Sequence, residues 1–149
     1  MSLFLSTFEN RVDQKGRVSV PSQFRSVLQQ EGRDFVVLYE SFINTCLEGC
    51  SLARLEELNG KIDSLDPFSE ERDAFATVVL GGSAQLSFDG NGRIVLPKHL
   101  IDFARIEDRA IFVGKGQIFE IWNNRLFDEH LLRARAQIGK NKGVFRDAK

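Results

Sequence analysis

The chain has 149 residues and a formal net charge of −1, with 42% hydrophobic and 28% charged residues, which suits one globular unit or two small halves that share a core. No apolar run approaches the ~18 residues of a membrane helix, and the N-terminus lacks the basic region and long apolar stretch of a secretory signal. These features argue against a membrane-spanning, secreted or disordered protein and favour a cytoplasmic one.

One pattern occurs twice in the chain. Residues 13–21 read DQKGRVSVP and residues 89–97 read DGNGRIVLP, and the two stretches align without a gap. Both fit D-x-x-G-R followed by an apolar residue, any residue, an apolar residue and proline. Such agreement within a short chain indicates an internal duplication.

The segments that follow each copy also share one order. Each proline precedes a short helical pattern and then two β-rich runs. These runs cover residues 35–39 and 45–48 in the first copy, and 110–113 and 118–122 in the second. A longer helix closes each copy, with Ser51 as the N-cap of the first and Asn123 or Asn124 before the second. Each copy is therefore expected to form strand, turn, strand, short helix, hairpin and helix.

A further helix has no counterpart in the repeat. Pro67 precedes residues 69–80, which begin with an acidic turn and end at two glycines, as helices commonly do. An apolar stripe of Phe75, Val78 and Val79 is expected to pack against the body. The expected division is a first repeat at 4–51, connecting helices at 52–82, a second repeat at 83–126, and a C-terminal helix with a basic tail at 127–149.

The repeated turn combines residues that build tight turns with residues that bind anions. An aspartate can accept hydrogen bonds from backbone amides across a turn, and a glycine supplies a positive φ. The turn-forming residues are therefore expected to be Asp13, Gly16, Asp89 and Gly92. Alternation along the next strand buries Val18 and Ile94 and directs the arginine of each copy away from the core.

These arginines, Arg17 and Arg93, are the main candidate functional residues. An arginine on a rigid turn suits contacts to guanine edges or to phosphates. Each could instead be an ordinary exposed arginine or form an ion pair with the aspartate of its own turn. Lys15 adds a second cation to the first copy, where it would contact phosphate. Segregated charge allows a near-neutral chain to carry such a local positive face.

The duplicated motif followed by a short helix resembles the paired SpoVT/AbrB-type half-domains of the MraZ family of transcriptional regulators. In the second half, residues 80–82 (LGG), 113–114 (VG) and 119–122 (FEIW) strengthen the resemblance, which covers about residues 4–136. It implies an α+β fold, mainly a β-barrel with flanking helices. In this fold two swapped hairpin halves of one chain close an AbrB-like double-psi barrel.

The resemblance also implies a function. A chain with this resemblance is expected to be a sequence-specific DNA-binding regulator on the nucleoid. It would repress the division and cell-wall gene cluster, including its own operon, at tandem promoter repeats. Double-stranded DNA and further copies of the chain, in a ring-like homo-oligomer, are the implied partners. The implied DNA-binding residues are Lys15, Arg17 and Arg93, with Arg11 and Lys98 as weaker neighbours. Because Asn91 stands where the first copy has Lys15, the two copies are expected to contribute unequally.

The apolar faces of the two longer helices also favour assembly. They exceed what one small barrel needs, and exposed patches of this kind usually mark an interface. The residues concerned are Leu52, Leu55, Leu58 and Ile62 on one helix, and Leu126, Phe127, Leu131 and Leu132 on the other. Contact between two unlike surfaces can close into a ring of more than two subunits.

Other classes of function find less support. The sequence lacks the motifs of hydrolases, phosphate-binding loops and zinc proteases, so no enzyme activity and no small-molecule substrate is expected. Cys46 and Cys50 are expected to be half-buried free thiols, and His99 and His130 lie too far apart in sequence to complete a metal site with them. No cofactor or metal is therefore expected. The alternative is an AbrB-type antitoxin or another protein-interaction module, although such antitoxins usually carry one half and a toxin-binding tail.

Overall fold

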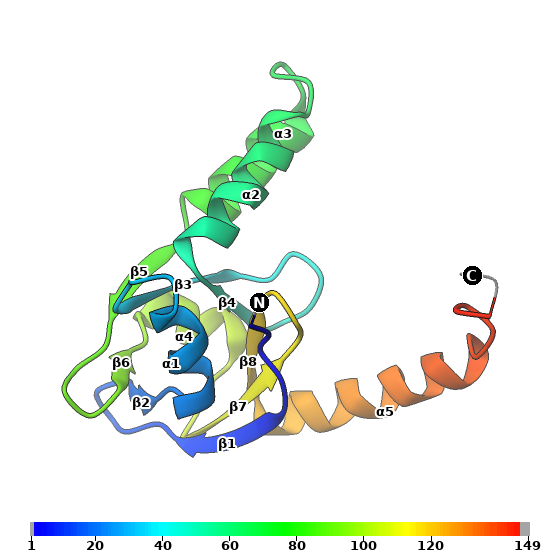
Figure 1. Ribbon diagram of the computed structural model, residues 1–149. Coiled ribbons are helices and arrows are strands. Elements are labelled where there is room, and N and C mark those ends of the chain that lie inside the picture. The colour runs from blue at the N-terminus through cyan, green and yellow to red at the C-terminus, as the bar shows by residue number, and fades with distance from the viewer. Residues whose placement is uncertain (1, 147–149) are drawn as a thin grey trace.

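The computed structural model describes residues 2–146 and has an α+β architecture (Figure 1). A six-stranded antiparallel sheet and a two-stranded antiparallel ribbon form the body, and helices flank it. In chain order the elements are β1 (Thr7–Arg11), β2 (Arg17–Ser19), α1 (Ser22–Gln29), β3 (Phe35–Glu40), β4 (Leu47–Cys50), α2 (Leu52–Asp63), α3 (Glu70–Phe75), the π-helical η1 (Ala76–Leu80), β5 (Ala84–Ser87), β6 (Arg93–Val95), α4 (Lys98–Ala104), β7 (Arg109–Gly114), β8 (Phe119–Asn123) and α5 (Asn124–Lys140). The predicted α+β fold class, a β-sheet body with flanking helices, is confirmed.

The sheet joins the two copies by exchanging their first strands. The strand order is β1-β7-β8-β4-β3-β5, so β1 of the first copy pairs with β7 of the second, and β5 of the second pairs with β3 of the first. The hairpins β3–β4 and β7–β8 meet at the β4–β8 seam, and β2 pairs with β6. Neither copy therefore has a complete sheet without the other.

One core lies beneath both copies, and Phe24 of α1 is central to it. The Phe24 side chain is fully buried, and its ring centroid lies 5.4 Å from that of Phe4, 6.4 Å from that of Phe112 and 5.0 Å from that of Phe119. Aromatic pairs at such distances each add ~0.5–1.5 kcal/mol beyond simple burial. Leu100 of α4, at the repeat position of Phe24, is fully buried in the same core. The two short helices thus close the shared core.

Side-chain caps set the starts of the longer helices. The hydroxyl of Ser51 accepts a hydrogen bond from the backbone N–H of Arg54 at 3.2 Å, which confirms the predicted start of α2. Of the two asparagines considered for α5, Asn123 is the cap, since its side-chain oxygen accepts hydrogen bonds from the N–H groups of Arg125 and Leu126. These caps satisfy N–H groups that a first helical turn leaves without partners.

Three local predictions need correction. The second strand of the first copy covers Leu47–Cys50 instead of residues 45–48, because Ser41 and Cys46 close the preceding loop through a backbone hydrogen bond of 2.9 Å. The helix expected over residues 69–80 changes to π-helix at Ala76, which buries Val79 and leaves Val78 44% exposed.

The third correction concerns the two cysteines. Both thiols are fully buried instead of half-buried, and this burial raises the pKa of Cys46 and brings that of Cys50 to about 12. Within residues 2–146, no three His, Cys, Asp or Glu side chains gather as a metal site would require. None of the helices in this range has the length and apolar character needed to cross a bilayer.

The β4–β8 seam provides a test of the packing. A Cβ added to Gly49 of β4 would lie 2.4–2.8 Å from ring carbons of Phe119, so Gly49→Ala overpacks the core. We expect it to lower the free energy of unfolding by about 1–3 kcal/mol and Tm by several degrees. The matched control is Gly60→Ala in α2, where an added Cβ meets nothing within 4 Å. This variant should raise stability by about 0.5–1 kcal/mol. A Gly49→Ala protein that melts like the unsubstituted chain would contradict the tight seam.

Candidate nucleic-acid interface

The β2–β6 ribbon presents one outward face, which we call the ribbon face. Its strands pair Arg17 with Val95, Val18 with Ile94, and Ser19 with Arg93. Val18 and Ile94 are each 1% exposed and point into the core. The ribbon face therefore consists of Arg17, Ser19, Arg93 and Val95. It lies far from the α2–α3 helical hairpin and from the C-terminal end of α5 (Figure 1).

An aspartate organises the turn that precedes each ribbon strand. In the first turn, Oδ1 of Asp13 accepts hydrogen bonds from the backbone N–H groups of Lys15 and Arg17, both at 2.9 Å. Gly16 has a φ of 81° and donates its N–H to the carbonyl oxygen of Asp13 at 3.0 Å. A side chain would strain this backbone conformation. The turn is thus rigid at the point where Arg17 leaves it.

The second turn repeats this geometry. Oδ1 of Asp89 accepts hydrogen bonds from the N–H groups of Asn91 and Arg93 at 2.8 and 2.9 Å. Gly92 has a φ of 74° and donates to the carbonyl oxygen of Asp89 at 3.0 Å. The duplication therefore extends from the sequence pattern to individual hydrogen bonds.

Each aspartate also holds the arginine of its turn. The Nε atom of Arg17 lies 2.7 Å from Oδ2 of Asp13, and that of Arg93 lies 2.9 Å from Oδ2 of Asp89. The ion pair considered from the sequence is thus present in both turns. The backbone N–H of the arginine residue is the largest cause that lowers the pKa of each aspartate. Burial opposes this effect, and the side chain and charge of the arginine lower the pKa further.

The ion pair leaves most of each guanidinium available. A guanidinium has five N–H donors, and only the Nε–H of Arg17 and of Arg93 donates to another group within residues 2–146. Both arginine side chains are about one third exposed, at 38% and 34%. Ion pairs exposed to this extent add little stability, so the main effect of each pair is to fix the direction of its arginine.

Sequence reasoning missed a cation beside the second turn, Arg25 of α1. Its Nε–H donates to the carbonyl oxygen of Val20 at 3.1 Å, and a Cβ at Gly92 would lie 2.5 Å from its Cζ. At the first turn the equivalent neighbour is Ile101 of α4, whose Cδ1 would lie 3.3 Å from a Cβ at Gly16. The sequence did contain one signal for this cation. When the two copies are aligned, Arg25 stands where the second copy has the apolar residue Ile101.

The remaining candidate cations lie around the ribbon face. Lys15 is exposed in the first turn, and Arg11 is exposed at the end of β1, next to Val12, which pairs with Val18. Lys98 starts α4 three residues after β6, and its Nζ lies 2.7 Å from Oδ2 of Asp102. The structure thus places Lys15, Arg17, Arg25 and Arg93 at the ribbon and its turns, together with the two turn aspartates.

The two histidines take no part in this surface. The ring of His130 stacks on Trp122 with centroids 4.6 Å apart, and partial burial lowers the pKa of His130. Nε2 of His99 lies 3.2 Å from the carbonyl oxygen of Gly82. Both histidines therefore make local packing or backbone contacts.

Comparison with known proteins gives the family. A family model described as "MraZ protein, putative antitoxin-like" matches residues 79–142. A protein of Rickettsia akari (strain Hartford) named transcriptional regulator MraZ is 47% identical over 148 residues, which cover 99% of both chains. Its namesake in Rickettsia bellii (strain OSU 85-389) is 50% identical over 135 residues, or 90% of both chains. This chain therefore belongs to the MraZ family.

Proposed function

We propose that the chain is a sequence-specific DNA-binding transcriptional regulator that reads double-stranded DNA with the ribbon face. The observation that carries the proposal is the pair of arginines, each held by an aspartate, on the outward side of a two-stranded ribbon. The major groove of B-DNA is ~12 Å wide and admits such a ribbon. The names of the two relatives as transcriptional regulators support the same function.

Each cation has a role that its geometry suits. With Nε engaged by aspartate, the outer edge of the Arg17 and Arg93 guanidinium groups faces the ligand and can bond O6 and N7 of guanine. Lys15 and Arg25 sit beside the two turns and would contact phosphates, which position the protein without reading sequence. Arg11 and Lys98 would add outer contacts, with the charge of Lys98 partly offset by Asp102.

The proposed target follows from the family relationship. It is a set of tandem promoter repeats upstream of the division and cell-wall gene cluster, including the operon of the regulator itself, and the proposed outcome of binding is repression. A protein with this target works on the nucleoid in the cytoplasm. The duplicated turn supports repeated sites, because contacts that recur along DNA raise avidity without new kinds of contact.

We further propose that the chain assembles into a ring-like homo-oligomer. Several apolar residues of α2 and α5 were expected to be free for contacts between copies but instead pack within the chain. They include Leu58, Ile62, Phe127 and Leu131. Other apolar residues are exposed on the parts of the chain that project from the body, among them Phe68, Leu132, Ile138, Val144 and Phe145, at 95%, 68%, 69%, 60% and 84%. They lie near the tip of the α2–α3 hairpin and along the outer part of α5 and the turns after it, two arms that leave the body in different directions (Figure 1).

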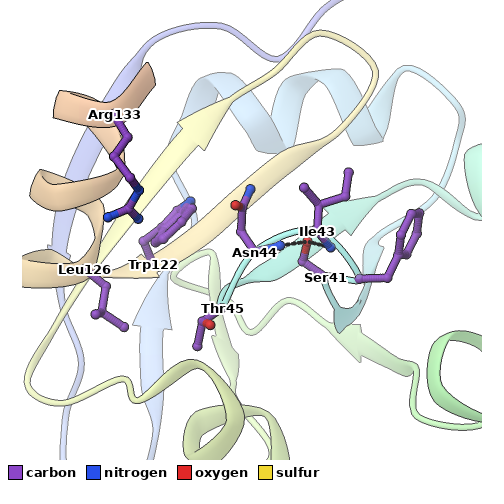
Figure 2. A pocket seen from close by; sticks show the side chains of 8 residues that line it. Ser41, Ile43, Asn44, Thr45, Trp122, Leu126 and Arg133 are labelled. Atoms are coloured by element: carbon purple, nitrogen blue, oxygen red, sulfur yellow. Dashed lines mark hydrogen bonds between the residues drawn. The ribbon is translucent and has the colours of Figure 1, made fainter. Parts of the chain in front are cut away.

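A hollow at the base of α5 offers a place for such an arm. Figure 2 shows it between the loop after β3 and the start of α5, with Trp122 between Asn44 and Arg133. Its volume is about 370 Å³, and Phe42 and Ile43 at its rim are 48% and 74% exposed. Contact of an arm with an unlike surface on the next copy is heterologous and closes into a ring when the rotation allows.

The first prediction from the proposed function concerns Arg17 and is tested on the DNA upstream of the coding sequence of the protein. Arg17→Gln should weaken binding by about 5- to 150-fold for each guanine that the side chain bonds, with an unchanged melting curve. The matched control is Arg72→Gln, since Arg72 is 34% exposed and lies 2.7 Å from Asp63 on the helical hairpin. Fluorescence anisotropy measures both affinities. Wild-type affinity in folded Arg17→Gln would refute the proposed function, and capture of a protein partner without DNA binding would support the antitoxin-like alternative.

The second prediction tests the role of Arg25. Arg25→Ile copies the first turn, where Ile101 packs beneath Gly16, so the fold should be retained while one cation is removed. The slope of log affinity against log salt should become shallower by about 0.9 per phosphate contact and per subunit bound. Adding Asn91→Lys should restore the slope, because it supplies the cation that the first turn has at Lys15. An unchanged slope in Arg25→Ile would leave Arg25 as a packing residue only.

The third prediction concerns assembly. Light scattering should give a mass several times the 16.9 kDa of one chain, and Ile138→Asp on α5 should reduce that mass. Glu129→Gln, at an exposed polar position of the same helix, is the control and should leave the mass unchanged. A mass of one chain at every concentration would contradict the ring and leave the apolar arms unexplained.

A further inference from the structure

The two ends of the ribbon face differ, although their arginines match. At one end Arg17 lies opposite Val95, and at the other Arg93 lies opposite Ser19. Ser19 and Val95 occupy the same position of the repeat. The ribbon is thus symmetric in its guanidinium groups and asymmetric in the side chains beside them.

Val95 has no packing role that explains an apolar side chain. It is 53% exposed, and it belongs to none of the hydrophobic clusters formed by the described residues. Its neighbour Ile94 supplies the buried side chain of this strand at 1% exposure. A single exposed apolar residue is common on protein surfaces, but this one lies on the proposed DNA-binding face, opposite Arg17.

The chemistry of the major groove offers Val95 one kind of partner. Base edges there present hydrogen-bond donors and acceptors, and the C5-methyl of thymine is their apolar group. Facing side chains of an antiparallel pair have Cβ atoms about 5 Å apart, while successive base pairs are about 3.4 Å apart. A base contacted by Arg17 and a neighbouring thymine methyl are therefore both within reach of this end of the ribbon.

On the basis of the proposed DNA-binding function, we propose that Val95 is a specificity-determining residue that contacts the methyl group of a thymine next to the base contacted by Arg17. The Ser19 end lacks this contact and offers a hydroxyl to a polar edge instead. One ribbon therefore reads a directional sequence despite its internal two-fold pattern. Directional reading fits sites repeated head to tail and disfavours palindromes.

The test uses full-length protein and the DNA upstream of its coding sequence, with each thymine of one repeat replaced in turn by deoxyuridine, which lacks only the methyl group. Replacement of one particular thymine per ribbon should weaken DNA binding by the unsubstituted protein about fourfold, which is the effect expected for one buried methyl group. Val95→Ser copies the other end of the ribbon and should bind both versions of that site equally. Val95→Thr keeps one methyl and should retain part of the discrimination.

Two controls separate the possible outcomes. Ser19→Ala should leave the response to deoxyuridine unchanged, and all three variants should keep the melting temperature and the oligomer mass, since both positions are exposed. If the unsubstituted protein binds specifically but ignores every methyl, or if Val95→Ser discriminates as before, the role of Val95 is overturned. A change of oligomer mass in Val95→Ser would make it a protein contact and also overturn the proposal. No specific binding by the unsubstituted protein would instead overturn the proposed function itself.

Discussion

The exchange of first strands between the two copies is the constraint on which the rest of the structure depends. Because β1 pairs with β7 and β5 pairs with β3, each copy completes its sheet only in the presence of the other. The inward side chains of the ribbon, Val18 and Ile94, are buried in the core that this exchange creates. The two turns are consequently fixed relative to each other through a packed interior, without any need for a loop or linker to position them.

The parts of the structure that follow short-range rules were predictable from the sequence. Two-residue alternation identified which side of the ribbon carries Arg17, and a serine before an apolar helical pattern identified the cap of α2. The internal repeat indicated equivalent turns, and the structure gives them equivalent hydrogen bonds.

The parts that depend on contacts between distant segments were not predictable. Arg25 meets Gly92 only because the two copies interlock, and nothing local to α1 indicates that neighbour. The complete burial of the two cysteines also depends on distant segments, since Cys46 packs on Trp122 of the second copy and Cys50 packs on Val79 of η1. The sequence allowed two interpretations of Arg17 and Arg93, either an ion pair with the aspartate of the turn or a contact with a ligand. The geometry makes these interpretations compatible, because the aspartate engages one edge of each guanidinium and leaves the rest exposed.

The buried cysteines have a practical consequence. Cys46 immediately precedes β4 and packs with Ile111, Trp122 and Phe127 of the second copy, whereas Cys50 ends β4 and packs with Val37, Tyr39 and Val79. Burial raises their pKa and keeps reagents away, and a thiol reacts quickly only as an accessible thiolate. Alkylation of either thiol in the folded chain therefore requires its own cluster to open. The rate of labelling at Cys50 thus measures how often α2 and η1 leave the sheet, and the rate at Cys46 measures how often the loop before β4 leaves the second copy, without any engineered probe.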